Sequence, residues 1–197
     1  MGVVTGPDII HEQTLERLVK QYQTELLRMC FLYLRDTELA RDAVQETYIK
    51  VYRSLDSFRG DSGEKTWLIR IAINTCRDMH RSAWFRHTDR RVTPDMLPVS
   101  SGKAEEKDED VLLSVMALPV KLRETVLLYF YQNMSMKEIA ETLKLSSSAV
   151  SARLDRAKKK TTRRTRREGI PWMSKGSENS FTIPLRCGFL TCKVTLG

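Results

Sequence analysis

Two glycines, a lysine and a threonine stand between two aromatic residues in the stretch FRGDSGEKTW, residues 58–67. These residue types could cradle a phosphate, because backbone N–H groups and a lysine ammonium can converge on its oxygens. A phosphate loop needs a second glycine directly before its lysine, and Glu64 occupies that place. The residues before the stretch also follow a helical pattern rather than that of a buried strand. The spacing therefore argues against phosphate binding, and the stretch stays a candidate site of another kind.

Other groups that could do chemistry are scattered along the chain. His11, His80 and His87 do not combine with serine and aspartate into a nucleophilic triad, and the four cysteines show no C-x-x-C spacing. We therefore expect no enzyme activity, no metal site and no cofactor.

The length of 197 residues and an apolar content of 41% suit one medium-sized domain or two small ones. No apolar run reaches the roughly 18 residues of a membrane span, and the N-terminus lacks the pattern of a signal peptide. We expect a soluble, cytoplasmic protein without membrane insertion.

The net charge of +8 is concentrated in residues 153–167, which carry nine lysines and arginines against one aspartate. Such a block attracts polyanions, above all nucleic acids. A solvated, frayed helix end is the alternative interpretation.

Residues 135–158, SMKEIAETLKLSSSAVSARLDRAK, predict a helix-turn-helix. Ser135 and Glu138 can form a capping box, and Ser146 or Ser147 can cap the second helix. Polar groups on the second helix could then reach base edges in the major groove. The residues predicted to contact DNA from the second helix are Ser148, Ser151, Arg153, Asp155, Arg156 and Lys159. An ordinary helical hairpin is the alternative.

Helical periodicity also dominates residues 12–85, which we expect to form a separate helical domain. Its second helix has an apolar stripe: Ala40, Ala43, Val44, Thr47, Tyr48, Val51, Tyr52 and Leu55. The opposite face presents a candidate protein interface: Asp42, Gln45, Glu46, Ile49 and Arg53. An isoleucine in a polar stripe suggests a partner's anchor point, although single exposed apolar residues are also common.

The helix after the loop is expected to bury Trp67, Leu68, Ile71, Ala72, Thr75 and Met79. Its outward stripe consists of Arg70, Asn74, Arg77 and Arg81, with Trp84 and Phe85 beyond it. Cations of this kind follow a nucleic-acid backbone, while amide and aromatic groups meet unstacked bases. For Trp84 and Phe85, burial in the core is an equal alternative.

Residues 86–110 lose this periodicity and predict a flexible linker. Residues 111–163 predict a second helical domain that contains the helix-turn-helix, and residues 164–197 a basic and then irregular tail. The predicted fold is therefore all-α, with two small helical domains.

Residues 42–78 and 118–160 resemble an RNA polymerase sigma factor of the extracytoplasmic-function (ECF) group of the sigma-70 family. The resemblance implies that the Ile49 stripe docks on the polymerase clamp helices. It also implies that the loop takes a base flipped out of the minus-10 element, and that the helix-turn-helix reads the minus-35 element. The minus-10 residues would be Phe58, Arg59, Gly60, Asp61, Ser62, Arg70, Asn74, Arg77 and Arg81. Core RNA polymerase, promoter DNA and an anti-sigma factor are the implied partners.

The tail after Arg167 matches nothing in that family, and either a regulatory extension or an altered reading frame would account for it. Two other functions remain open. An autonomous helix-turn-helix regulator would bind duplex operator DNA by itself, usually as a dimer. An RNA-binding protein that uses the basic segment would show salt-dependent binding without promoter specificity.

Overall fold

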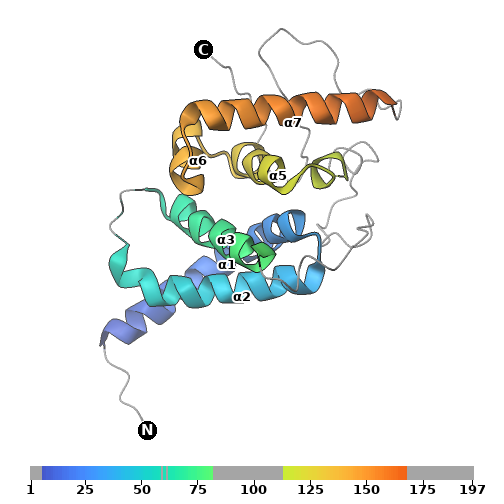
Figure 1. Ribbon diagram of the computed structural model, residues 1–197. Helices are drawn as coiled ribbons and strands as arrows, with labels where there is room; N and C mark the ends of the chain where they lie inside the picture. The colour runs from blue at the N-terminus through green and yellow to red at the C-terminus, as the bar shows by residue number, and fades with distance from the viewer. Residues whose placement is uncertain (1–5, 59, 61, 82–112, 168–197) are drawn as a thin grey trace. The chain divides into compact units, whose positions relative to one another are not determined.

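The computed structural model describes residues 6–58, 60, 62–81 and 113–167, and within these ranges the side chains from residue 9 to residue 162. The described secondary structure is helical throughout, which confirms the all-α prediction for this part of the chain. The chain divides into two compact units, one on each side of the boundary between Pro98 and Val99 (Figure 1). None of the described helices has the length and apolarity needed to cross a bilayer.

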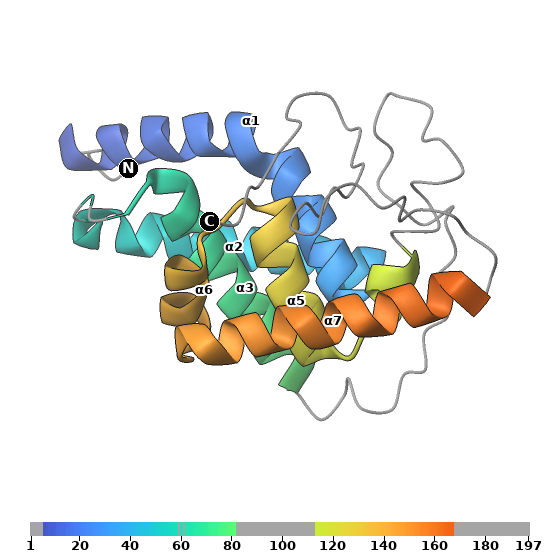
Figure 2. The same ribbon diagram turned by 90° about the horizontal axis from the view of Figure 1, so that it is seen from above.

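The first unit consists of α1 (Gly6–Leu34), α2 (Thr37–Ser54), a short 3-10 helix η1 (Leu55–Ser57) and α3 (Glu64–Arg81). Each of α1, α2 and α3 packs on the other two (Figures 1 and 2). Every residue from Met29 to Leu34 is buried, so the end of α1 is enclosed rather than amphipathic. This packing places the loop between α2 and α3 at the end of the bundle where α1 begins.

The start of α2 follows from a cap. The Asp36 carboxylate accepts a hydrogen bond from the Leu39 backbone N–H at 2.8 Å, which satisfies a donor that the first turn leaves open.

Polar groups at the centre of the first unit are costly to ionise. Burial raises the pKa of Tyr48 to about 12. A hydrogen bond with the Cys30 thiol, together with burial, raises the pKa of Cys76 well above its ordinary value. Within the described part of the chain, the buried Tyr48 hydroxyl has no hydrogen-bond partner. These groups therefore belong to a low-dielectric core and stay neutral at physiological pH.

The second unit consists of a helical turn at residues 113–116, α5 (Val120–Val126), a π-helical turn η4 (Leu127–Tyr131), α6 (Met136–Leu143) and α7 (Ser147–Arg167). α7 packs on both α5 and α6 (Figures 1 and 2). The core of this unit contains Val126, Leu127, Ile139 and Val150, while Phe130 is only half-buried.

Several predictions about burial need correction. Trp67, Ile71 and Met79 of α3, predicted to be buried, are only half-buried. Tyr52 is 38% exposed, because it lies in the last turn of α2, beyond the end of the buried stripe at Val51. On α3, Ile69, Ile73 and Cys76 are buried although the sequence did not indicate them. The buried face of α3 is wide because this helix packs on two others, α1 and α2.

Candidate protein and nucleic-acid interfaces

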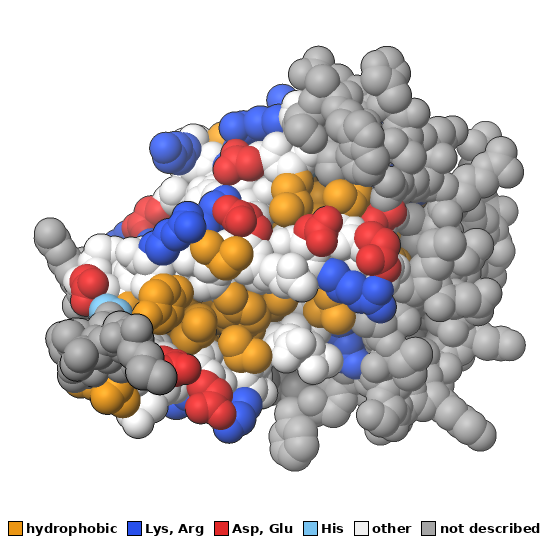
Figure 3. All heavy atoms as spheres, turned by 90° about the horizontal axis from the view of Figure 1, so that it is seen from below, with side chains coloured by type: hydrophobic (Ala, Val, Ile, Leu, Met, Phe, Trp, Pro, Cys, Tyr) orange, Lys and Arg blue, Asp and Glu red, His pale blue; other side chains and the backbone are white. Residues whose placement is uncertain are grey.

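The face of α2 opposite the buried stripe is available to a partner. Asp42, Gln45 and Arg53 are exposed there, and Ile49 is 45% exposed. Apolar side chains gather on the side of the first unit seen in Figure 3 and are bordered by acidic and basic ones. Ile49 and Tyr52 on α2 are among the exposed apolar residues of the described chain. The predicted exposure of the stripe is thus confirmed for these four residues, while its role as an interface stays a prediction.

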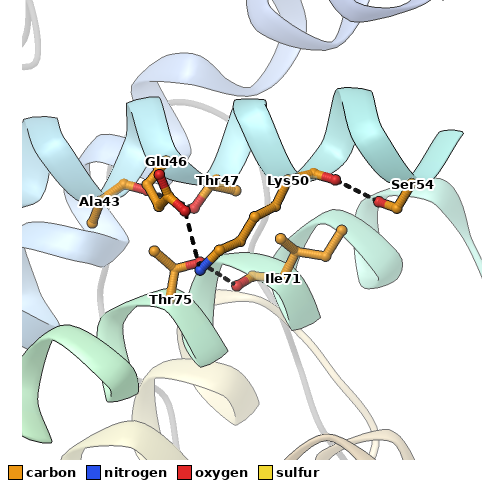
Figure 4. A network of polar contacts seen from close by, with 7 residues as sticks. All are labelled: Ala43, Glu46, Thr47, Lys50, Ser54, Ile71 and Thr75. Carbon is orange, nitrogen blue, oxygen red and sulfur yellow. Dashed lines mark hydrogen bonds and ion pairs between the residues drawn. The ribbon is translucent and has the colours of Figure 1, made fainter.

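Glu46 differs from the rest of the stripe because it is half-buried and belongs to a contact network between α2 and α3 (Figure 4). The Lys50 ammonium lies 3.5 Å from the Glu46 carboxylate and donates a hydrogen bond to the Thr75 hydroxyl at 3.2 Å. Thr75 in turn donates to the Ile71 carbonyl at 3.0 Å. Glu46 therefore contributes to the packing of α2 on α3 as well as to the exposed face.

The loop between α2 and α3 is closed at its base by two aromatic rings. Phe58 and Trp67, which flank the loop, stack with their ring centroids 4.8 Å apart and their planes tilted by 35°. Gly60 has a φ of +74° and open space around its missing Cβ, so its backbone conformation rather than crowding requires glycine. Ser62 is half-buried, whereas Arg59 and Asp61 lie outside the described residues.

The four residues of the predicted nucleic-acid stripe all lie on α3. Asn74 and Arg81 are exposed, while Arg70 and Arg77 are half-buried. Arg81 lies 3.7 Å from the Asp78 carboxylate, a weak surface pair that leaves its charge accessible. Trp84 and Phe85 lie outside the described residues.

The helix-turn-helix forms as the sequence predicts. The Ser135 hydroxyl accepts a hydrogen bond from the Glu138 N–H at 3.2 Å, and the Glu138 carboxylate accepts one from the Ser135 N–H at 2.9 Å. α6 ends at Lys144 in a left-handed conformation with φ 55°, and the Ser146 hydroxyl then caps α7. These local contacts define where α6 begins, where it ends and where α7 begins.

Five of the six predicted minus-35 residues are exposed on α7: Ser148, Ser151, Asp155, Arg156 and Lys159. The expectation that Arg153 is also exposed is wrong, because its side chain is only 18% exposed. Its guanidinium forms an ion pair with the buried Glu124 carboxylate of α5 at 2.8 Å and donates to the Lys121 carbonyl at 3.3 Å. Arg153 lies three residues after buried Val150 and four before buried Ala157, so the helical repeat directs it inward. This spacing is the feature of the sequence that could have predicted the inward location of Arg153.

Several polar contacts near the loop escaped the sequence analysis. His11, Arg17 and Glu25 of α1 pair with Asp56, Glu64 and Lys65, respectively. Each pair joins residues 40 or more positions apart, so no local pattern indicates it. Among the described residues there is no group of three or more histidine, cysteine or acidic side chains that could hold a metal ion.

The comparisons with known proteins assign both units. Residues 18–86 match the family model "Sigma-70 region 2", and residues 108–161 match "Sigma-70, region 4". The RNA polymerase sigma-H factor of Pseudomonas aeruginosa is 31% identical over 161 residues, which cover 75% of this chain and 83% of that protein. The chain belongs to the ECF group of the sigma-70 family. The ECF sigma-E factor of Salmonella typhi is a further relative of this sigma factor, with 30% identity over 165 residues that cover 75% of this chain and 84% of that protein.

Solved structures agree with the fold of this sigma factor. RpoE from Bartonella quintana, solved with the anti-sigma factor NepR, matches with a TM-score of 0.62 and 19% identity over 77% of this chain and 96% of its own. CnrH, solved with the cytosolic domain of CnrY, matches with a TM-score of 0.58 and 24% identity over 80% of this chain and 90% of its own. These matches confirm the predicted fold class.

Proposed function

We propose that this sigma factor binds core RNA polymerase, directs it to promoters with specific minus-10 and minus-35 elements, and helps to open the DNA. The observation that carries the proposal is the order of the two family matches, with region 2 preceding region 4 on one chain. The protein itself catalyses no reaction and acts where the polymerase and the chromosome are, in the cytoplasm. The α2 stripe would bind the polymerase, and the two nucleic-acid surfaces would recognise the minus-10 and minus-35 elements.

The α2 stripe is the proposed contact with core polymerase. Its apolar centre, Ile49, is surrounded by the charged and amide groups of Asp42, Gln45, Glu46 and Arg53. A partly exposed apolar anchor within a polar rim is the usual anatomy of a protein interface. This arrangement supports a contact with a helical partner such as the polymerase clamp.

The loop and the outer face of α3 are the proposed minus-10 site. The full set is Phe58, Arg59, Gly60, Asp61, Ser62, Arg70, Asn74, Arg77 and Arg81. Exposed Asn74 offers an amide that can read the edge of an unpaired base, and the arginines offer charge to the strand's phosphates. Extracting a base costs least where the strands are already separating.

The exposed face of α7 is the proposed minus-35 site, made of Ser148, Ser151, Asp155, Arg156 and Lys159. Arg156 can bond guanine in the major groove, and Lys159 lies further along the helix for a phosphate. We leave Arg153 out of this set, because its guanidinium pairs with Glu124 within the unit.

An anti-sigma factor is a further proposed partner. Two of the structures with a similar fold are complexes, one of which names the anti-sigma factor NepR. A protein that covers the α2 stripe would keep this sigma factor from core polymerase.

Run-off transcription with purified core polymerase and a promoter library tests the function. We expect transcripts that depend on the added protein and on both promoter elements. Specific binding of the free protein to duplex DNA, with no effect on core polymerase, would instead identify an autonomous regulator.

Ile49→Glu tests the polymerase contact. A charge at the anchor should weaken binding to core polymerase by about 2 kcal/mol or more, roughly 30-fold, while Ile49→Val should stay close to the original affinity. Affinity is measured by titration of labelled protein with core enzyme. Loss of helix in the circular dichroism spectrum of Ile49→Glu, or unchanged affinity, would count against the interface.

A further inference from the structure

The beginning of α1 lies outside the residues that match the region 2 family model. The region 2 match starts at residue 18, whereas α1 starts at Gly6. We call residues 6–17 of this helix the α1 extension. Figures 1 and 2 both place the start of α1 beside the turn that leads from α2 to α3. The extension therefore stands next to the loop that carries the proposed minus-10 site.

One contact of the extension holds the entry side of the loop. The His11 Nε2 atom lies 2.9 Å from the Asp56 carboxylate in η1, two residues before Phe58. The His11 ring also meets the Tyr52 ring edge to face, with their centroids 6.0 Å apart. The His11 side chain is 20% exposed and that of Asp56 is 85% exposed, so the imidazole is packed against the unit while the carboxylate stays in contact with water.

A second contact holds the exit side. The Arg17 guanidinium donates two hydrogen bonds to the carboxylate of Glu64, the first residue of α3, one of them 2.8 Å long. Such a two-point contact fixes orientation as well as distance. The hydrogen bond from Arg17 lowers the pKa of Glu64, which keeps that carboxylate charged.

The next residue of α3 is held with the opposite polarity. Lys65 donates to the Glu25 carboxylate of α1 at 2.6 Å. The acidic Glu64 and the basic Lys65 of α3 thus pair with the basic Arg17 and the acidic Glu25 of α1, respectively. A slip of α3 along α1 would separate both pairs, so together they favour this register at the loop's exit.

We propose that the α1 extension is a positioning element, in which His11 and Arg17 hold the two ends of the loop in the geometry that reads a minus-10 base. The proposal rests on the proposed function of the loop. His11 and Arg17 need not touch DNA. Their effect is to order the loop before DNA arrives, which removes an ordering cost from the step in which the base is captured.

The experiment compares Arg17→Glu with the double variant Arg17→Glu/Glu64→Arg, both in the full chain bound to core polymerase. Lys20→Glu is the matched control, because it makes the same charge change one turn further along α1, where Lys20 pairs with Glu16 of the same helix. We expect Arg17→Glu to lower run-off transcription about tenfold, the double variant to recover most of it, and Lys20→Glu to stay within about twofold of the original protein. His11→Phe, which keeps an aromatic ring against Tyr52, should lower it less than Arg17→Glu does.

A selectivity measurement separates positioning from a merely structural role. The ratio of transcripts from two promoters that differ in one minus-10 base should fall in Arg17→Glu, whereas the ratio for two promoters that differ in one minus-35 base should not change. Equal defects in Arg17→Glu and Lys20→Glu, no recovery in the double variant, or a parallel fall of both ratios would overturn the proposal. Failure of the original protein to start transcription would instead overturn the proposed function.

Discussion

The ion pair between Arg153 and Glu124 joins two charged side chains that are both largely buried. The Glu124 side chain is 4% exposed and the Arg153 side chain 18%, so both charges have lost much of their hydration. A buried charge whose partner is removed is left uncompensated. Arg153 therefore stabilises the second unit by holding α7 against α5.

Arg153→Ala should lower the free energy of unfolding of the second unit by about 3 kcal/mol. Arg156→Ala removes an exposed side chain, so it should leave stability within about 0.5 kcal/mol. On promoters where Arg156 contacts a base, the same change should cost about 1–3 kcal/mol of binding. Urea unfolding and promoter titration measure the two effects. An Arg153→Ala variant that is as stable as the original protein but has a relaxed minus-35 preference would show that Arg153 contacts DNA and does not stabilise the unit.

Single residues show why part of the site was predictable. The capping box at Ser135 and Glu138 is local, and the structure confirms both of its hydrogen bonds. The inward location of Arg153 could be read from its spacing to Val150 and Ala157, although the charge of an arginine favours exposure, but its partner carboxylate 29 residues away could not. Contacts between distant residues leave no local signal, and the pairs of His11 and Arg17 were missed for the same reason.

At the scale of elements, the attachment of α3 to α1 depends on ionised carboxylates. The pKa of Glu64 is lowered in the folded protein, chiefly by the hydrogen bond from Arg17. A lowered folded-state pKa means that the stabilisation is complete above the unfolded-state pKa and disappears as pH falls through the folded-state value. The contact of Arg17 with Glu64 is thus present at neutral pH and lost in acid.

Glu64→Gln should therefore be less stable than the original protein at pH 7, and the difference should shrink as the pH falls below the ordinary range of a glutamate carboxyl. Thermal unfolding at a series of pH values measures the difference. Glu38→Gln on α2, whose partner Arg41 is three residues away and exposed, is the control and should show a smaller effect. A stability difference that stays constant down to acid pH would show that the charge of Glu64 does not contribute to the stability of the fold.

The elements also show the limits of periodicity. α2 follows its predicted stripe until Val51, and the capped helices of the helix-turn-helix begin where the sequence places them. α3 does not follow a single stripe, because a helix between two partners buries a wider face. The existence of these elements was predictable, but the width of a buried face depends on how many neighbours the fold supplies.

At the scale of the whole molecule, charge is divided unevenly between the parts of the chain. Residues 153–167 carry nine basic residues against one aspartate, so this segment alone equals the net charge of +8. Lys158, Lys159 and Lys160 of α7 are exposed. The remainder of the chain is balanced, so we expect long-range attraction to DNA to come mainly from α7.

Lys159→Gln should reduce the salt dependence of promoter binding. Each phosphate contact contributes about 0.9 to the slope of log K against log salt, so the slope of the polymerase complex should fall by about that amount. Lys20→Gln on α1 should leave the slope unchanged. Promoter affinity measured over a series of KCl concentrations gives both slopes, and parallel lines for all variants would argue against a phosphate contact at Lys159.

The ring stack at the base of the loop also has a practical consequence. Trp67 is one of three tryptophans in the chain, with Trp84 and Trp172, and it lies against Phe58 where the loop closes. Indole fluorescence responds to the polarity and rigidity around the ring. A version with phenylalanine at positions 84 and 172 would hence carry a single built-in optical reporter, which would let the capture of a promoter base be followed in real time without an attached dye.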